Sequence, residues 1–445
     1  MAPPLILPGS SPAELLAGRD GEPWLIDATT LSRGEARERV LARAQRLREA
    51  GLRPGERVAW LPKPTAAGIL AALAALEAGA QLALLPLRES HARLEEERLL
   101  LRPRLLLDED EEAPRRLPPA EPAGLPRRLL LRSSGSSGRP RWLMHGLAGL
   151  LASARAAARH LRLGAADTWL LSLPLDHVGG LGILLRSLVS GCALALPSGA
   201  GLAADLEARR PQLLSLVPAQ LRRLAHREPP VALRAVLVGG APLDAALRRQ
   251  ALAHGWPLVP SYGASETGSL VCAGADDSGC PLPPHLVEVD KDGFITVDSP
   301  ALFEAVLDER GAPVPRSPGP WRSQDLGHWR EGRLVVLGRA DGLINSGGEK
   351  IRPEEVEEAL LTLREVELAA VVAIPDTELG ERPAAFVAWR GASLSLAELR
   401  PRLEPLLARH KHPARLWPWP ADEEREWKPR RAWLRQLALE LLDKC

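Results

Sequence analysis

Small and hydroxyl-bearing side chains follow a short apolar run at 129–131. They are Ser133, Ser134, Gly135, Ser136, Ser137 and Gly138, with Arg139 and Pro140 next. Glycine lets backbone N–H groups converge on an anion, and serine adds hydroxyl donors, so this segment suits a polyphosphate. No Gly-Lys-Ser/Thr follows, which excludes a Walker A loop. A flexible Ser/Gly linker is the alternative interpretation.

Two further polar turns follow predicted strands at 235–238 and 256–259. The first turn consists of Gly239, Gly240, Ala241 and Pro242. Its small residues would let the backbone approach a flat ring, although an ordinary strand-to-helix turn explains them equally well.

The second turn spans residues 261–268 and holds Tyr262, the one tyrosine of the sequence. Tyr262 offers a flat face for a base, Ser265 a donor for a phosphate and Glu266 a hard oxygen ligand for Mg²⁺. Loops at the ends of parallel strands are where α/β proteins bind ligands. A simple polar turn is the alternative.

Four more residues have types that suit a nucleotide or an acid. Asp325 could accept hydrogen bonds from ribose hydroxyls, and Arg339 could reach ribose or phosphate, unless both are surface charges of a β-hairpin. Lys428 stands out because six of the 57 basic residues are lysines, and a lysine can follow a moving phosphate or carboxylate. His177 lies in the run LPLDHVGG, where a structural role is the alternative.

Alternating helix and strand patterns must position these residues. The pattern predicts a helix at 35–50, a strand at 57–61, a helix at 65–79 and a strand at 81–86. The alternation resumes through 165–260, which favours parallel sheets. Residues 108–128 read as an exposed loop and 282–337 as β-rich, with turns at 292–293 and 331–332.

The pattern restarts near residue 340. It predicts a helix at 353–363, strands at 367–374 and 384–389, and a helix at 396–409. We therefore expect an α/β fold with a large N-terminal domain, residues 1–340, built of parallel sheets and a β-rich subdomain. A small mobile α+β domain, residues 341–445, would follow.

Composition limits the class of protein. A chain of 445 residues is longer than one compact core usually accommodates, so we expect at least two domains. A content of 45% hydrophobic and 25% charged residues is typical of a soluble protein. A net charge of +1 favours neither nucleic acid nor an anionic membrane. No apolar run is long enough to span a membrane, and the first residues, Met1 to Pro4, lack the basic n-region expected of a signal peptide. Cys192, Cys272, Cys280 and Cys445 form no CxxC pair, so we expect reduced thiols in a cytoplasmic protein.

In their order along the chain these segments resemble the adenylate-forming superfamily of acyl-CoA synthetases, luciferases and peptide-synthetase adenylation domains. The resemblance covers nearly the whole sequence and runs through SSGSSGRPR, VGGAPL, YGASE, Asp325, GRADG, GGEK and Lys428. Within the superfamily the chain is most similar to the o-succinylbenzoate–CoA ligases of menaquinone synthesis. The segments LSLPLDHVGGLGILLRSL, SLVPAQLRRL, SETGSLVC and GGEKIRPEEVE carry that similarity.

The resemblance implies a role for each position. Ser133–Gly138 would hold the β- and γ-phosphates, and Tyr262 with Gly263 and the turn Gly239–Pro242 would enclose adenine. Ser265 would contact the α-phosphate, Glu266 would bind Mg²⁺, and Asp325 with Arg339 would hold the ribose. Asp341 would be the hinge, and Lys428 would bridge the acid and the α-phosphate. His177 would gate the acyl pocket, with Gly347 and Gly348 lining the thiol tunnel.

Some positions depart from the superfamily pattern. Serines and arginines replace threonines and lysines in the phosphate loop, and Trp427 precedes Lys428 where glycine is usual. Asp176 stands where an aromatic residue is usual, and Gly179 where serine is common. These two lie near the predicted acyl pocket and bear on which acid is bound.

We therefore predict an ATP-dependent carboxylate–CoA ligase that uses ATP, Mg²⁺ and CoA, with o-succinylbenzoate as its acid. That acid has a second carboxylate that is not activated, and a helix starting near Pro218 would bring Arg222 or Arg223 within reach of it. The alternatives are a ligase for another aryl or acyl acid, one that loads a carrier protein, and a non-catalytic nucleotide- or acyl-binding relative. A homodimer is left open.

Overall fold

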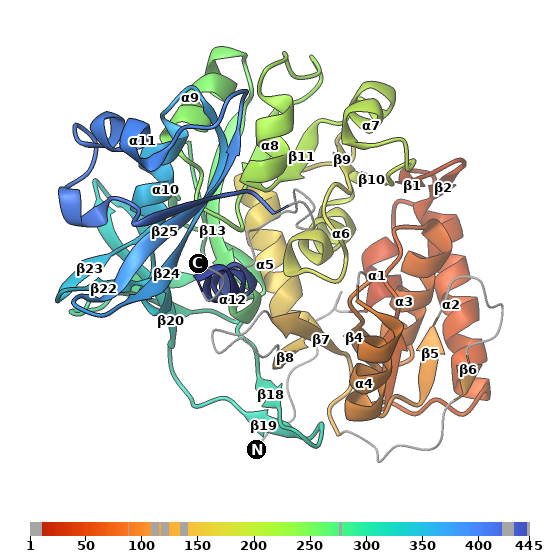
Figure 1. Ribbon diagram of the computed structural model, residues 1–445. Coiled ribbons are helices and arrows are strands. Elements are labelled where there is room, and N and C mark those ends of the chain that lie inside the picture. Colours follow the sequence, from red (N-terminus) through yellow and green to blue (C-terminus); the bar gives the residue numbers. More distant parts are fainter. Residues whose placement is uncertain are drawn as a thin grey trace.

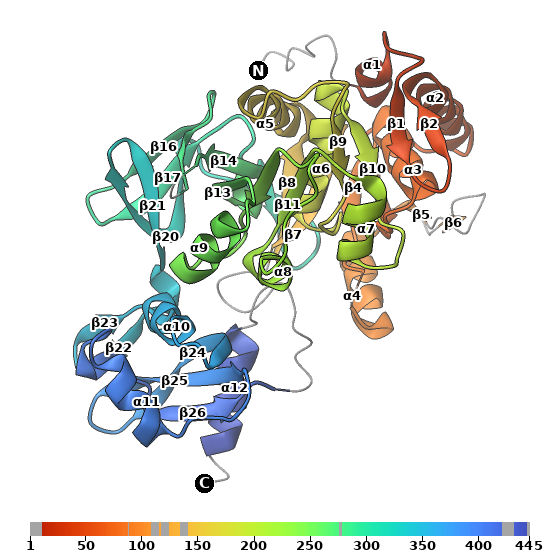
Figure 2. The same cartoon turned by 90° about the horizontal axis from the view of Figure 1, so that it is seen from above.

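The computed structural model describes residues 11–87, 89–107, 115–116, 124–133, 141–275, 278–420 and 431–442. Figures 1 and 2 show two large sheets with helices around them, a smaller antiparallel sheet and a C-terminal unit in blue beside them. Within the described residues, no helix has the length and apolar character needed to cross a membrane. The α/β fold class predicted from the sequence is confirmed.

The first large sheet has nine strands in the described chain and supports most of the candidate site. Its order is β15 (Cys280–Pro281), β14 (Ser269–Ala273), β13 (Leu258–Ala264), β12 (Ala235–Val238), β11 (Leu213–Leu216), β9 (Thr168–Leu170), β10 (Ala193–Ala195), β1 (Pro23–Ile26) and β2 (Thr30–Ser32). The strands from β13 through β12, β11, β9 and β10 to β1 are parallel. Short runs such as Leu213–Leu216 are buried throughout, as expected of parallel strands covered on both faces.

The second large sheet has eight strands in the described chain. Its order is β19 (Pro313–Pro315), β18 (Ala305–Leu307), β8 (Arg141–Gly146), β7 (Arg128–Ser133), β4 (Gln81–Leu84), β3 (Arg57–Trp60), β5 (Leu105–Leu107) and β6 (Arg115–Arg116). The short strand β6 lies within 108–128, where the sequence predicted only loop.

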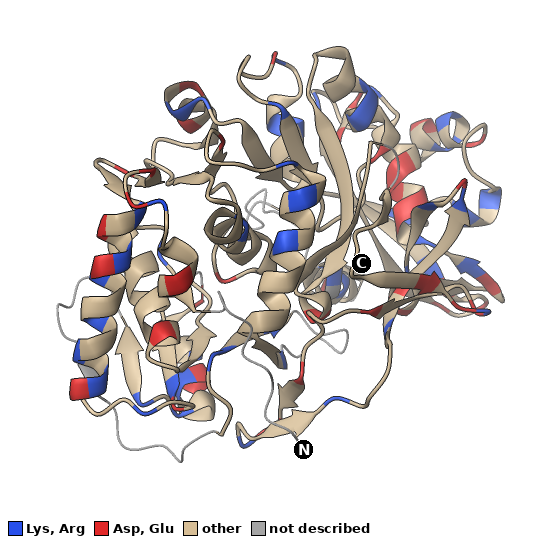
Figure 3. Ribbon diagram, turned by 180° about the vertical axis from the view of Figure 1, so that it is seen from behind, with Lys and Arg blue, Asp and Glu red and all other residues tan. Residues whose placement is uncertain are grey.

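Helices fill the space between and around the two large sheets. They are α1 (Pro12–Leu16), α2 (Arg33–Glu49), α3 (Ala66–Glu77), α4 (His91–Leu101), α5 (Leu147–His160), α6 (Val178–Ser190), α7 (Leu202–Arg209), α8 (Pro218–Leu224) and α9 (Ala245–Ala253). Side chains of α3, α5 and α6 share one continuous core with strands of both sheets. Figure 3 shows basic and acidic residues interspersed along the outer helices.

A smaller antiparallel sheet follows, in the order β16 (Leu286–Val289), β17 (Phe294–Asp298), β20 (Trp321–Arg330) and β21 (Arg333–Arg339). The predicted β-rich stretch 282–337 is thereby confirmed. The hairpin β20–β21 pairs Asp325 directly with Arg339.

The C-terminal unit is a sheet covered on both faces. Its elements are β22 (Ile344–Ser346), β23 (Glu349–Ile351), α10 (Pro353–Leu361), β24 (Val366–Asp376), β25 (Gly380–Trp389), α11 (Leu396–Leu403), β26 (Arg415–Pro418) and α12 (Arg431–Leu442). Helices α10 and α11 share a core with one face of the sheet, and α12 packs on the other face. The domain boundary at residues 340 and 341 stays a prediction.

Two local predictions were wrong. The helix predicted at 396–409 ends at Leu403, because Pro405 has no N–H with which to continue the helical hydrogen bonds. The turn predicted from Ser261 is still strand as far as Ala264, because β13 continues into antiparallel pairing with β14. Tyr262 therefore lies on a strand, and Glu266 lies on the short 3₁₀ helix Ser265–Thr267 that follows.

Candidate active site

An open cleft of about 3230 Å³ lies where β9, β11 and β12 end and is bordered by residues of the C-terminal unit. Most of the residues predicted from the sequence line it. They are Ser133, His177, Arg222, Gly239, Gly240, Ala241, Pro242, Tyr262, Gly263, Ser265, Glu266, Asp325, Arg339 and Asp341. The structure thus brings together residues that are up to about two hundred positions apart in sequence, because the ends of the parallel strands of one sheet meet the end of β7 and the hairpin β20–β21 of two other sheets at this cleft.

The remaining predicted residues fall into two groups. Ser134–Gly138 and Lys428 lie outside the described residues. Gly347 and Gly348 form the turn between β22 and β23, where the Gly347 N–H donates to the Leu379 carbonyl at 2.8 Å. Neither glycine is among the described residues that line the cleft. Their predicted role in a thiol tunnel stays a proposal.

A chain of polar contacts connects Tyr262 to the hairpin β20–β21. The Tyr262 hydroxyl donates to Asp325 Oδ2 at 2.8 Å, and the other Asp325 oxygen is 3.8 Å from Arg339 Nη1. Arg339 donates to both oxygens of Asp341, at 2.8 and 2.6 Å. Hydrogen bonding to Asp341 raises the pKa of Arg339, and burial followed by the charge of Asp325 raises the pKa of Tyr262.

This network can hold a nucleoside. A ring face, a carboxylate that can accept from two hydroxyls and a fixed guanidinium together match a base, a ribose and a phosphate. Gly263 is required for close packing beside Tyr262, since a Cβ there would lie 1.8 Å from the Ser269 carbonyl oxygen.

Glu266 is half-buried at the floor of the cleft. Burial is the largest cause of its raised pKa, and the charges of Arg141 and Arg339 lower that pKa only in part. A cation would stabilise the ionised form of this carboxylate. No group of three or more His, Cys, Asp or Glu suited to a metal occurs among the described residues. One carboxylate combined with substrate phosphates is a usual setting for Mg²⁺, so Glu266 fits that ion.

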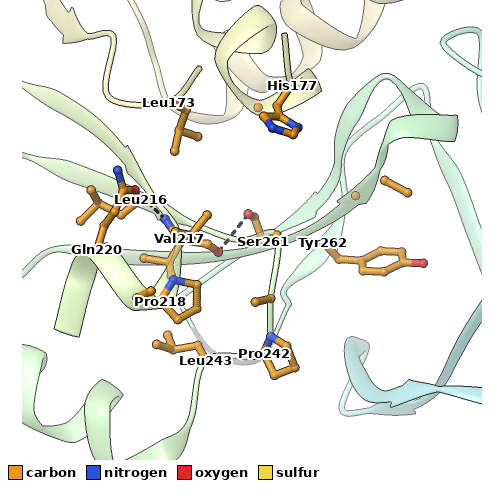
Figure 4. Close-up of a pocket in the computed structure, with 18 of the residues that line it drawn as sticks. Leu173, His177, Leu216, Val217, Pro218, Gln220, Pro242, Leu243, Ser261 and Tyr262 are labelled. Carbon is orange, nitrogen blue, oxygen red and sulfur yellow. Dashed lines mark hydrogen bonds between the residues drawn. The ribbon is translucent and has the colours of Figure 1, made fainter. Parts of the chain in front are cut away.

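The other end of the cleft is largely apolar. His177 occupies the N-cap position of α6, where its side chain makes no capping hydrogen bond, and it is exposed at the cleft wall. Figure 4 shows His177 and Leu173 on one side of the pocket, with Val217 and Pro218 facing them and Ser261 and Tyr262 alongside. Such a pocket can hold the hydrocarbon part of an acid next to the nucleotide.

Arg222 has a partner within the protein. The helix predicted to start near Pro218 is α8, and Arg222 Nη2 donates to Asp244 Oδ2 at 2.5 Å. Asp244 also caps α9 by accepting from the Leu247 N–H. The sequence prediction did not foresee this pair, and substrate binding by Arg222 would have to compete with it.

Arg186 is a buried cation that the sequence interpretation missed. It lies on α6, is 3% exposed and lines the cleft. Its Nη2 donates to Ser269 Oγ at 3.0 Å, and its guanidinium lies 5.6 Å from the centre of the Trp169 ring. Within the described residues its Nε has no hydrogen-bond partner, and burial lowers its pKa to about 10. An arginine inside the apolar run GILLRSL was the available signal, because a charge on a buried helix requires a polar partner.

Residues 102–339 match the AMP-binding enzyme family, and residues 355–423 match the AMP-binding enzyme C-terminal domain. The chain belongs to the AMP-binding enzyme family. Among curated relatives, the 2-succinylbenzoate–CoA ligase of Salmonella typhimurium is 36% identical over 67% of this chain and 66% of its own length. The ligase of that name from Bacillus cereus strain AH820 is 30% identical over 84% of this chain and 87% of its own.

Solved structures of AMP-binding enzymes have the same fold over nearly the full chain. An Escherichia coli MenE variant with bound OSB-AMS has a TM-score of 0.82 at 30% identity, over 94% of this chain and 96% of that one. The Bacillus subtilis o-succinylbenzoate CoA synthetase in complex with the acyl-adenylate intermediate OSB-AMP has a TM-score of 0.81 at 25% identity, over 97% and 98%. By sequence, the chain spans a little under two thirds of the first curated relatives, 66% and 62%.

Proposed function

We propose that this AMP-binding enzyme is an ATP-dependent carboxylate–CoA ligase, and that its acid is o-succinylbenzoate. The acid's carboxylate oxygen attacks the α-phosphorus of ATP, pyrophosphate leaves and an acyl-AMP remains. The thiol of CoA then attacks the acyl carbon, and AMP leaves. A free carboxylate is a poor acyl donor, and joining it to AMP supplies a good leaving group.

The cleft residues support this sequence of steps. Tyr262, Asp325 and Arg339 would hold the nucleoside, and Glu266 would hold Mg²⁺, whose charge would neutralise that of the phosphates. His177 stands between the acyl pocket and the solvent. Lys428 would bridge the acid and the α-phosphate in the first step, and a rotation about Asp341 would bring Gly347 and Gly348 in for the second.

The observation that carries the choice of acid is the buried guanidinium of Arg186. The Arg186 side chain lines the cleft, its Nε has no partner among the described residues, and Ser269 supplies a neutral hydroxyl instead of a charge. A buried charge is costly unless it is paired. The second carboxylate of o-succinylbenzoate would pair with it, whereas a monocarboxylate would leave it unpaired. The names of the curated relatives agree with this acid.

A pyrophosphate-release screen over aromatic and aliphatic acids, with and without CoA, tests the proposal. The wild type should prefer o-succinylbenzoate over benzoate. Arg186→Met should lower kcat/KM for o-succinylbenzoate by about ten- to a hundredfold, the equivalent of about 1.5–3 kcal/mol for a charge-assisted hydrogen bond. Activity on benzoate should hardly change, because benzoate has no second carboxylate.

Arg222→Met is the matched control, since Arg222 lines the same cleft but is paired with Asp244. If Arg222→Met lowers kcat/KM for o-succinylbenzoate more than Arg186→Met does, Arg222 and not Arg186 binds the second carboxylate. If the wild type prefers a monocarboxylate, o-succinylbenzoate is not its substrate, and only the proposal of an ATP-dependent carboxylate–CoA ligase remains.

CoA as the thiol, a homodimer and a cytoplasmic location are further parts of the proposal. Product formation with CoA, and none with a carrier protein bearing a phosphopantetheine thiol, tests the first. Light scattering measures the mass of the particle in solution, and cell fractionation measures the location. ATP binding without pyrophosphate release from any acid would instead favour the non-catalytic relative.

A further inference from the structure

Glu97 on α4 is a buried carboxylate outside the site described above. It is 5% exposed, and its Oε2 accepts from the Trp142 indole N–H at 2.6 Å. Its Oε1 lies 3.2 Å from Arg132 Nε. One carboxylate therefore contacts side chains of two different strands, β7 and β8.

Those two strands are paired at this position. Arg132 faces Trp142 across the β7–β8 ladder, and the next pair toward the cleft is Ser133 with Arg141. The Ser133 hydroxyl donates to the Arg141 carbonyl at 3.4 Å. Glu97 thus joins the two strands at the edge of the cleft, which Arg132 lines together with Ser133 and Arg141.

A second carboxylate supports the same arginine. Glu89 Oε1 accepts from Arg132 Nη1 at 2.6 Å, so Arg132 lies between two acids. Ser133 and Arg141 are the next residues along the same two strands. Neighbouring side chains of a strand point to opposite faces, so fixing the direction of Arg132 and Trp142 also fixes the direction of Ser133 and Arg141. Both of these residues line the cleft, and the Arg141 charge acts on Glu266.

We infer that Glu97 is a positioning residue for the nucleotide's β- and γ-phosphates, acting through Arg132 and Trp142 on Ser133 and Arg141. The inference rests on the proposed function. The positioning effect of Glu97 should be specific to ATP, because AMP has neither a β- nor a γ-phosphate. Glu97 itself contacts no part of the substrate.

The experiment compares the affinities of Glu97→Gln and the wild type for ATP and for AMP, by calorimetry without any acid. Glutamine keeps the shape and an acceptor for Trp142 but loses the charge opposite Arg132. We expect the dissociation constant for ATP to rise about tenfold, the low end for a charge-assisted contact, with AMP binding unchanged. KM for the acid and thioester formation from supplied acyl-AMP should also be unchanged.

Two further variants complete the design. Trp142→Phe keeps a smaller aromatic ring and removes the indole N–H that donates to Glu97, so ATP binding should weaken by about two- to tenfold. Glu95→Gln is the matched control, since Glu95 lies on the same helix, is 46% exposed and pairs with Arg98. It should bind both nucleotides as the wild type does.

Equal loss of ATP and AMP binding, or unchanged ATP binding in both Glu97→Gln and Trp142→Phe, would overturn the inference. If Glu97→Gln does not fold, Trp142→Phe decides by the same comparison. Failure of the proposed ligase activity would appear separately, as absence of pyrophosphate release by the wild type. The calorimetric comparison needs no acid and is not affected by that outcome.

Discussion

The Tyr262 hydroxyl and the Asp325 carboxylate are joined by a hydrogen bond of 2.8 Å, although 63 positions separate the two residues. The contact connects strand β13 of the nine-stranded sheet to strand β20 of the smaller antiparallel sheet. It places the flat face of the chain's one tyrosine next to the carboxylate that we propose for the ribose. In the proposed function, base and sugar recognition would therefore share one contact.

Tyr262→Ala should weaken ATP binding by about 1–3 kcal/mol, the usual contribution of one base stacked on an aromatic side chain. Tyr262→Phe keeps the ring and should lose much less affinity. Calorimetry with ATP and with inorganic triphosphate gives the comparison, and triphosphate binding should be the same in all three proteins. An alanine variant that binds ATP as tightly as the wild type would remove Tyr262 from the nucleotide site.

Glu266→Gln should raise the Mg²⁺ concentration needed for half-maximal pyrophosphate release and slow that step, because a neutral amide is a weaker ligand for a hard cation. Burial raises the pKa of Glu266, so its ionised form is lost at a higher pH than that of an exposed glutamate. The Mg²⁺ requirement of the wild type should therefore rise as pH falls toward the acid range. An unchanged Mg²⁺ titration in the variant would contradict the assignment.

Lys428→Ala should abolish acyl-AMP formation and spare thioester formation from supplied acyl-AMP. The reason is that the proposed lysine contact exists only while the acid and ATP are being joined. Single-turnover assays of the two half-reactions separate the effects. Equal loss of both would show that Lys428 is needed throughout, and the two-conformation proposal would fail.

Arg431→Met should destabilise the C-terminal unit. Arg431 begins α12 and forms ion pairs with Glu354 and Glu357, the latter at 2.6 Å. Glu357 also accepts from the Val371 N–H at 2.7 Å. Removing the arginine leaves a buried carboxylate unpaired, which costs about 3–5 kcal/mol in free energy of unfolding. Urea denaturation checks this, with Arg435→Met as control, because Arg435 pairs with Glu381 at the surface and is 53% exposed.

The loss in Arg431→Met should also depend on pH. Burial raises the pKa of Glu357, and the charge of Arg431 lowers it in part, so the variant should have a still higher pKa. A carboxyl group whose pKa is higher in the folded than in the unfolded protein destabilises the fold at pH values above that raised pKa. The effect disappears at pH values low enough to protonate the carboxyl group in both the folded and the unfolded protein. The difference from the wild type should shrink as pH falls toward the ordinary pKa of glutamate. A difference that is constant with pH would contradict this account.

Local sequence was enough to predict most of the elements that support the cleft. The strand Ala235–Val238 begins and ends as predicted, and the helix predicted from Pro353 begins there, with Glu354 and Glu355 in its first turn. Both depend on residues close together in the chain: an apolar run followed by two glycines, and proline with acids at a helix start. The misplaced end of α11 had a local signal too, in Pro405.

The ordered motifs of the sequence by themselves determined the fold class and the family of this protein. Most of the site residues that they predicted line the cleft, although Gly347 and Gly348 do not and Arg186 was missed. Tertiary structure alone decided how individual charges are paired. Arg222 meets Asp244 across 22 positions of chain and Arg186 meets Ser269 across 83. Glu97 meets Trp142 across 45 positions and Arg132 across 35. Such pairs depend on how whole helices and strands pack, and the pairing of a charge changes its free energy by several kcal/mol once water is excluded. The amino-acid sequence shows which arginines and acidic residues are present, but the tertiary packing determines which of them pair with each other and which can bind the substrate.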